Sequence, residues 1–325
     1  RTMTLGWPSN MGGLRLGPSG IEWVVNIFNR QTLASVAVCA GTGLHCGEHV
    51  RMVLKPAAPG SGIVFERTDI TDHDNRIEAR AANVSGLRLG TTIANEAGAS
   101  VATVEHLMAA LAGLGVDDLL VEIDGPEVPV MDGSSAPFVE LINRVGLKAS
   151  AAPRRAIRVL KSVSVEFQGR TAAFLPSLKP VIDVEISFPH PAVGRQHYAF
   201  DISPEIFAGD VASARTFGFK RDVDAMRAAG LALGGSMDNA VVLDDSGVIN
   251  EEGLRFADEF ARHKALDALG DLYLAGAPIL ALYQAHQPGH ALNNAALRAL
   301  LADTTAWKMV SLSDAVTSPS AMARS

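Results

Sequence analysis

Glu105 and His106 are neighbours in the sequence Thr-Val-Glu-His-Leu, where they offer a carboxylate and an imidazole side by side. This stretch is predicted to form the first turn of a helix, in which successive side chains project about 100° apart. The two side chains can therefore border one cavity without bonding each other. Their types suit a metal ligand next to a general base.

A second group of the same types occurs in the sequence His-Lys-Ala-Leu-Asp, which places His263 and Asp267 at positions i and i+4. Asp271 continues the same stripe at i+8. Side chains four residues apart are neighbours on one face of a helix. An imidazole and a carboxylate one turn apart can bind a single ion.

A catalytic zinc normally has three protein ligands, with nitrogen and oxygen donors at about 2 Å, and keeps an open position for water. His106, His263 and Asp267 would supply that set. Glu105 would then remain as a nearby general base for the water. His290 is a further imidazole, predicted to lie in a turn, from which it could give a proton to a leaving amine.

Spacing alone leaves a simpler interpretation of each pair open. The order is not the His-Glu-x-x-His helix of zinc proteases, and a Glu-His pair in a first turn is also a favourable dipole arrangement at the start of a helix. His263 with Asp267 could equally be a surface pair worth about a few tenths of a kcal/mol.

The elements that carry the first pair are predicted from hydrophobic patterns. Residues 50–54 and 119–123 are short apolar or alternating segments bounded by turn residues, which indicates strands. The stretch between them has apolar residues at helical spacing, with Thr103 as the N-cap and Gly113 and Gly115 as stops. The first half is therefore expected to be a sheet with one helix packed on it.

Residues 150–155, Ser-Ala-Ala-Pro-Arg-Arg, interrupt this pattern and predict a boundary between an N-terminal domain, 30–152, and a C-terminal domain, 153–312. Strand-like segments resume at 157–167, 172–174 and 181–188. A helix at about 254–269 and a buried strand at 272–283 follow. This repeats the order of the first half, so we expect an α+β fold of two similar domains.

Composition limits the class of protein. A chain of 325 residues with 48% hydrophobic and 19% charged residues predicts a substantial folded interior and is long enough for two domains. A net charge of −7 argues against a nucleic-acid partner.

Cysteine use and the ends of the chain bear on location. Cys39 and Cys46 cannot form a disulfide framework and fit a reducing compartment, so we expect the cytoplasm. The apolar stretch 272–297 is too interrupted to span a bilayer, and no stable membrane insertion is expected. Residues 1–29 are expected to be a disordered or non-native leader, and residues 313–325 a flexible tail.

Six short motifs follow one another along the chain. They are Gly41-Thr-Gly-Leu-His-Cys-Gly47, Thr103-Val-Glu-His-Leu107, Pro129-Val-Met-Asp-Gly-Ser134, Ala214-Arg-Thr-Phe-Gly-Phe219, His263-Lys-Ala-Leu-Asp267 and Gly289-His-Ala-Leu-Asn-Asn294. Together and in this order they resemble the UDP-3-O-acyl-N-acetylglucosamine deacetylase (LpxC) family of lipid A biosynthesis. The likeness covers about residues 31–312.

The resemblance implies two α+β domains, each a sheet packed with a helical layer, with the active site between them. It implies a zinc-dependent amidohydrolase that removes the N-acetyl group of UDP-3-O-(3-hydroxyacyl)-N-acetylglucosamine and releases acetate. The expected cofactor is Zn²⁺, and the expected partner is this UDP-linked acylated amino sugar. A monomer in the cytoplasm of a Gram-negative bacterium is expected.

The resemblance also assigns catalytic roles at matching positions. The zinc ligands it implies are His106, His263 and Asp267, and the base is Glu105. The resemblance implies that His290 is the general acid, which also steadies the oxyanion, and that Asp271 is the carboxylate that orients it. Thr216 matches a hydroxyl that hydrogen-bonds the developing oxyanion. These roles supply what amide hydrolysis needs, namely carbonyl polarisation, a deprotonated water and a proton for nitrogen.

Substrate contacts are implied at five further positions. Phe217 and Lys264 match residues that line the sugar-nucleotide site, and Lys264 has the charge expected beside an anionic substrate. Val223, Gly235 and Ser236 match the insert that shapes the passage for the acyl chain.

The chain departs from the family pattern at Gly90-Thr91-Thr92, near the site, where some members carry cysteine.

Two rival functions are a zinc amidohydrolase for another substrate class, without the acyl passage, and a silent sugar-nucleotide binding protein that keeps the ligands structurally. Apolar lining of the passage would argue against the first rival. Glu105 and His290 argue against the second, because a structural zinc needs neither base nor acid.

Overall fold

The computed structural model describes residues 28–313 of the chain. It is a mixed α+β structure built from several sheets and helices. Apart from their inner ends, the predicted leader and tail lie outside the described residues.

The first large sheet uses only strands from the first half of the chain. Its order is β2 (Ala37–Thr42), β3 (His49–Pro56), β9 (Leu119–Ile123), β4 (Ile63–Arg67) and β5 (Arg76–Glu78). The central strand β9 pairs antiparallel with β3 and parallel with β4. The predicted strands at 50–54 and 119–123 are confirmed as parts of β3 and β9.

The second large sheet uses only strands from the second half. Its main path is β12 (Val163–Phe167), β13 (Arg170–Pro176), β19 (Ile279–His286), β11 (Arg155–Val159) and β20 (Trp307–Ser311). Strand β14 (Val181–Phe188) pairs parallel with β19 and antiparallel with β15 (Gly194–Asp201). Strand β19 is the hub of this sheet, because it pairs with β11, β13 and β14.

Three small sheets complete the strand structure. One pairs β1 (Asn29–Leu33) with β10 (Leu147–Pro153), and the second contains β6 (Val84–Gly86), β7 (Thr92–Ala94) and β8 (Ser100–Val101). The third contains β16 (Phe217–Phe219), β17 (Val241–Asp244) and β18 (Gly247–Val248), with helix α5 (Lys220–Ala228) between its first two strands.

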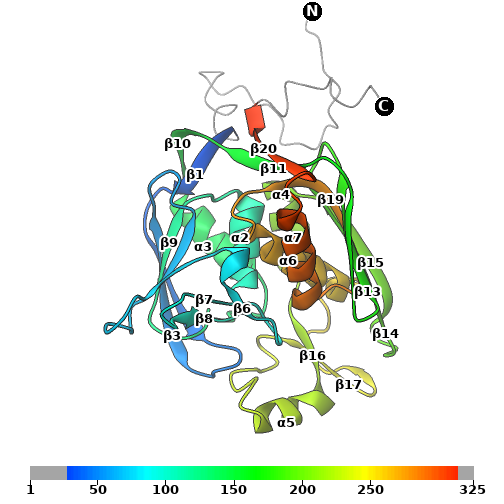
Figure 1. Cartoon of the computed structure of the whole chain (residues 1–325). Helices are drawn as coiled ribbons and strands as arrows, with labels where there is room; N and C mark the ends of the chain where they lie inside the picture. The colour runs from blue at the N-terminus through cyan, green and yellow to red at the C-terminus, as the bar shows by residue number, and fades with distance from the viewer. Residues whose placement is uncertain (1–27, 314–325) are drawn as a thin grey trace, which may run out of the picture.

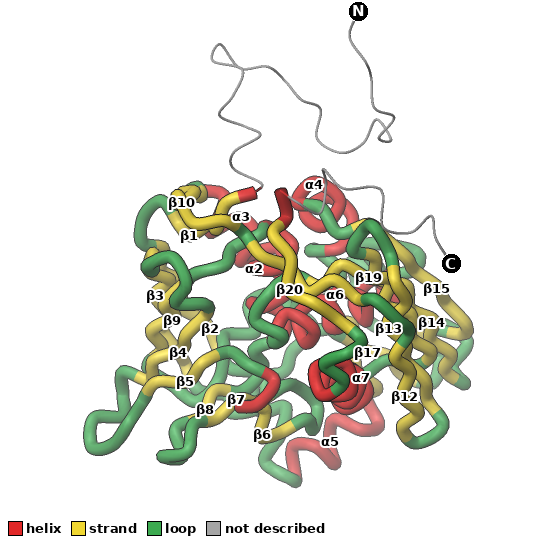
Figure 2. Tube along the Cα trace, turned by 45° about the horizontal axis from the view of Figure 1, so that its top comes forward, coloured by secondary structure: helices red, strands yellow, loops and turns green. Residues whose placement is uncertain are grey.

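A layer of helices separates the two large sheets (Figures 1 and 2). It contains α2 (Glu105–Leu114), α3 (Ala136–Val145), α6 (Glu259–Tyr273) and α7 (His290–Ala302). Shorter helical segments are η1 (Ala81–Asn83), α4 (Pro204–Ile206) and η2 (Phe207–Val211). Among residues 28–313 no helix combines the length and apolar character needed to cross a membrane.

Helices α2 and α6 pack directly against each other at the centre of the molecule, and nearly all their residues are buried. Two glycines allow close packing of these helices, Gly270 where α6 meets α2 and Gly113 where α2 meets η2. A Cβ on Gly270 of α6 would lie 2.1 Å from the backbone oxygen of Glu105, and one on Gly113 of α2 would lie 2.2 Å from the ring of Phe207. A helix glycine costs about 0.5–1 kcal/mol relative to alanine, but at these positions any side chain would push the packed elements apart.

Two details of the first predicted helix are wrong. Thr103 is not the N-cap, because Val104 precedes the helix and Thr103 has a left-handed φ of 57°. Its hydroxyl donates instead to Glu127 Oε1 at 2.7 Å. Gly115 ends the helix with φ 77°, as expected, but Gly113 lies inside it.

The second half departs from its predicted boundaries for local reasons. Helix α6 runs from Glu259 to Tyr273, so the predicted start at 254 and the predicted strand start at 272 are wrong. The left-handed Gly276, at φ 77°, comes between the helix and β19. His290 is the first residue of α7 rather than part of a turn.

The predicted interruption at 150–155 is also wrong in its local structure. Strand β10 continues to Pro153, and β11 begins at Arg155. Pairing with β1 keeps this segment extended despite its small residues and proline.

Candidate metal centre

His106, His263 and Asp267 converge where α2 meets α6. One ligand atom from each lies within 4.8 Å of the others, and all three side chains are buried. Asp267 Oδ1 lies 3.4 Å from His263 Nε2 and 3.6 Å from His106 Nε2. His106 comes from α2, whereas His263 and Asp267 are one turn apart on α6, and the two helices approach closely at Gly270.

The residues present fit a metal ion. Asp267 Oδ1 is a buried oxygen with no hydrogen-bond partner in the described part of the chain, while Oδ2 accepts from Lys264 Nζ at 2.9 Å. Burying an unpartnered carboxylate oxygen is costly, and a bound cation would remove that cost. Two imidazole nitrogens and one carboxylate oxygen are a donor set that suits a divalent transition metal.

The second imidazole is prepared for this role by its backbone partner. His263 Nδ1 donates to the carbonyl oxygen of Ala214 at 3.0 Å, which leaves Nε2 directed toward Asp267. Burial lowers the pKa of His263 to about 3, so its imidazole is neutral near pH 7. Neutral imidazole is the form that binds metals.

A second group, Glu105, His290 and Asp271, lies beside the triad. His290 Nδ1 is 2.9 Å from Asp271 Oδ2, and His290 Nε2 is 3.8 Å from Glu105 Oε1. Asp271 Oδ2 also accepts from Asn293 Nδ2 at 2.8 Å. The carboxylate of Asp271 thus orients the imidazole of His290 through Nδ1. The other ring nitrogen, Nε2, faces the carboxylate of Glu105.

The surroundings raise the pKa of both Glu105 and His290. Burial raises the pKa of Glu105, although the nearby imidazoles oppose the rise. Burial alone would lower the pKa of His290, but the negative charges of Asp271 and Glu105 raise it to about 10. Near neutral pH, His290 is therefore a proton donor beside a carboxylate of raised pKa, which is a combination suited to acid and base catalysis.

Thr216 follows two residues after Ala214, whose carbonyl accepts from His263, and is held by backbone contacts from two other segments. Its N–H donates to Gly133 O, and its carbonyl accepts from Val241 N, both at 2.8 Å. Gly133 has φ 83°, and a Cβ there would lie 2.1 Å from Asn239 O. The Pro-Val-Met-Asp-Gly-Ser motif of the first half therefore supports a residue of the second half.

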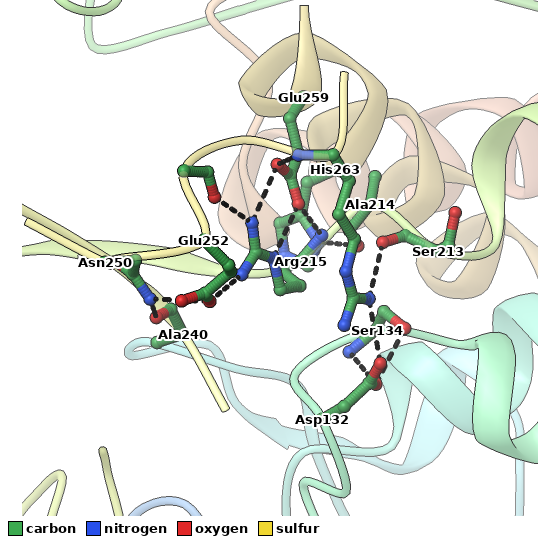
Figure 3. Close-up of polar contacts among 12 residues, drawn as sticks. Asp132, Ser134, Ser213, Ala214, Arg215, Ala240, Asn250, Glu252, Glu259 and His263 are labelled. Carbon is green, nitrogen blue, oxygen red and sulfur yellow. Dashed lines mark hydrogen bonds and ion pairs between the residues drawn. The ribbon is translucent and has the colours of Figure 1, made fainter. Parts of the chain in front are cut away.

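Arg215 fixes the same segment from the opposite side. Its side chain, 2% exposed, donates from Nε to Glu259 Oε1 at 2.9 Å and from Nη1 to Glu252 Oε1 at 2.6 Å. Figure 3 shows the guanidinium between these carboxylates, with His263 bonded to the neighbouring Ala214. The ion pair thus ties α6 to the segment that passes through Thr216 into β16.

The predicted substrate residues lie in three places. Lys264 Nζ lies 5.5 Å from the ring centroid of Phe217, and that ring lies 6.4 Å from the ring of His263. Gly235 and Ser236 lie in a loop next to residues 41–47, where Gly234 N donates to Leu44 O at 3.0 Å.

Val223 lies on α5, which is beyond β16 as seen from the central helices (Figure 1). No contact described for residues 28–313 joins it to the metal triad.

Sequence reasoning assigned no role to Thr91, Asn293 and Glu127, which hold parts of the site. Glu127 accepts hydrogen bonds from the backbone N–H groups of His45 and Cys46 and from the hydroxyl of Thr103. Thr91 contacts Glu105 and Asp271, which lie 14 and 180 residues away in sequence. The only sequence signal for Thr91 was its place in the departure from the family pattern.

Comparison with known proteins gives a consistent result. A family model described as LpxC, UDP-3-O-acyl N-acetylglycosamine deacetylase, matches residues 30–302. A UDP-3-O-acyl-N-acetylglucosamine deacetylase of Vibrio parahaemolyticus is 44% identical over 299 residues, which are 91% of this chain and 98% of that relative. A deacetylase of the same name from Phenylobacterium zucineum is 47% identical over 280 residues, 86% of this chain and 96% of the relative.

Proposed function

Because this chain belongs to the UDP-3-O-acyl-N-acetylglucosamine deacetylase (LpxC) family, we propose that it removes the N-acetyl group of UDP-3-O-(3-hydroxyacyl)-N-acetylglucosamine and releases acetate in lipid A biosynthesis. The observation that carries the proposal is the unpartnered Asp267 oxygen, flanked by two imidazoles and bordered by the Glu105 and His290 pair. A metal site beside an acid and a base suits the hydrolysis of an amide.

The metal in this proposal is one Zn²⁺, held by His106, His263 and Asp267. The donor set and its burial support this choice. When bound, the ion supplies Lewis-acid polarisation of the amide carbonyl and lowers the pKa of a water.

Glu105 acts as the general base and takes a proton from the attacking water. The carbonyl carbon then forms its bond to the water oxygen, and Thr216 donates a hydrogen bond to the carbonyl oxygen as negative charge develops on it. His290 steadies the same oxygen and gives its proton to the nitrogen as the carbon–nitrogen bond breaks. Asp271 keeps His290 protonated and directed toward the reacting group, which its hydrogen bond to Nδ1 supports.

The substrate is held by Phe217 and Lys264 at the sugar-nucleotide end, and the lysine charge complements the anionic diphosphate. This placement is supported by the position of Lys264 on α6, where its Nζ donates to Asp267 Oδ2 and lies over the ring of Phe217. Val223, Gly235 and Ser236 shape the passage for the acyl chain.

We further propose two domains, 30–152 and 153–312, with the active site between them. The large sheets support this division, because each draws its strands from one side of it. The free thiols of Cys39 and Cys46 support a cytoplasmic enzyme, which we propose to be monomeric.

The direct test is acetate release from the acylated UDP-sugar, measured together with metal content before and after chelation. We expect one zinc per chain and a loss of activity on its removal without global unfolding. Activity equal on UDP-N-acetylglucosamine lacking the acyl chain would favour an amidohydrolase of another substrate class. A fully zinc-loaded protein that releases no acetate would favour a silent binding protein.

A further inference from the structure

Thr91 bonds two carboxylates that belong to different helices. Its backbone N–H donates to Glu105 Oε2 at 2.9 Å, and its hydroxyl donates to Asp271 Oδ1 at 2.6 Å. The residue is 1% exposed, so both bonds are shielded from water. Glu105 begins α2 in the first half, and Asp271 lies on α6 in the second half.

We propose that Thr91 is a positioning residue, which holds the general base and the carboxylate behind the general acid in one geometry across the site. This inference rests on the proposed function, because it concerns the roles given there to Glu105 and Asp271.

The oxygens of Asp271 show what the hydroxyl contributes. Oδ2 accepts from both His290 Nδ1 and Asn293 Nδ2, and Oδ1 accepts from the Thr91 hydroxyl. Without that hydroxyl, Oδ1 would lose this partner in a buried site and the carboxylate would be free to turn. His290 would then lose the fixed orientation of Nε2 toward the reacting group.

The oxygens of Glu105 are divided in a similar way. Oε2 accepts the backbone N–H of Thr91, whereas Oε1 lies toward His290 Nε2 at 3.8 Å. Gly90 leaves room for Glu105 Oε1, because a Cβ on Gly90 would lie 3.0 Å from that oxygen. The bond from Thr91 therefore selects which oxygen is available to take a proton.

The loop that carries Thr91 is itself held in place. Leu89 has a left-handed φ of 63°, and Val104 N donates to Thr91 O at 3.2 Å at the start of α2. Among the hydrogen bonds described for residues 28–313, Thr91 binds the base through its backbone and the second half through its hydroxyl. That separation lets a side-chain substitution test the hydroxyl alone.

The test compares Thr91→Val, which removes the hydroxyl and keeps the β-branched shape, with Thr91→Ser, which keeps a hydroxyl. Thr92→Val is the matched control, since Thr92 is the next residue and no described hydrogen bond joins it to Glu105 or Asp271. We expect Thr91→Val to lower kcat by about 10- to 100-fold, the ratio for a lost hydrogen bond to a charged group, with a small change in KM. Thr91→Ser should recover kcat to within about threefold, and zinc content should stay at the level of the parent protein in all variants.

A double-mutant cycle with Asp271→Asn tests the connection itself. If Thr91 acts through Asp271, Thr91→Val should cost less than about threefold in kcat in the Asp271→Asn background, because the partner is already altered. Equal costs in both backgrounds would overturn the proposal, as would a Thr91→Val enzyme with unchanged kcat. A Thr91→Val protein that unfolds or loses its metal would assign Thr91 a structural role and also overturn it. The proposed function fails separately, if the unaltered chain releases no acetate.

Discussion

Gly270 on α6 meets the backbone carbonyl of Glu105 on α2 so closely that a Cβ would lie 2.1 Å from the oxygen. This contact is where the two helices that carry the proposed metal ligands cross. The separation of His106 from His263 and Asp267 therefore depends on the absence of a side chain at position 270.

Replacing Gly270 with alanine should separate the helices and weaken both the fold and the metal site. We expect a loss of about 1–3 kcal/mol in the free energy of unfolding, as for other overpacked interiors, and weaker metal affinity. Denaturant unfolding and metal titration measure the two effects. Gly209→Ala is the control, because a Cβ there would meet nothing within 4 Å. Unchanged metal affinity in Gly270→Ala would show that the crossing does not set the ligand geometry.

Glu105→Gln and His263→Ala should separate catalysis from metal binding. The glutamine cannot accept the proton of the attacking water, so we expect kcat to fall by about 10²- to 10⁴-fold while the zinc content stays the same. His263→Ala removes a proposed ligand and should lose the metal. Metal analysis and acetate release on the same preparations check both outcomes. Near-normal turnover by Glu105→Gln would rule out its role as the base.

The dependence of kcat on pH should have two limbs. A base works only when ionised, so the raised pKa of Glu105 moves the acidic limb above the pH at which an ordinary carboxylate ionises, about 4.3. An acid works only when protonated, so the pKa of about 10 at His290 places the alkaline limb near that pH.

Asp271→Asn tests the second limb. It removes the largest of the charges that raise the pKa of His290, so the alkaline limb should move to lower pH. An alkaline limb that stays in place in Asp271→Asn would show that a different group titrates there.

The buried Arg215 is expected to contribute strongly to stability. Arg215→Met leaves the buried carboxylate of Glu259 without its charged partner, which typically costs about 3–5 kcal/mol. Arg221→Met is the control, because its side chain is 67% exposed and its ion pair with Asp222 should contribute little. Thermal or denaturant unfolding measures both variants. Equal stability of the two would mean that the Arg215 ion pair does not hold the segment before Thr216.

The sequence by itself determined which residues share a helix face and which chemistry they offer. The adjacency of Glu105 and His106, and the spacing of His263, Asp267 and Asp271, follow from helix geometry, which depends only on neighbouring residues. The motif order added the expected family, and the family model and the relatives confirm it. Apolar patterns likewise placed β3 and β9 correctly.

Tertiary structure alone decided how the two helices meet and which residues hold them in register. The crossing at Gly270, the bonds of Thr91 to carboxylates 14 and 180 residues away, and the support of Thr216 by Gly133 all join distant segments. Local propensity could not predict them, since it also misplaced the N-cap at Thr103 and the start of α6. Such contacts depend on close packing between elements that are distant in sequence. The missing Cβ of Gly270 and the hydroxyl of Thr91 each act across such a contact, which a local sequence pattern cannot predict.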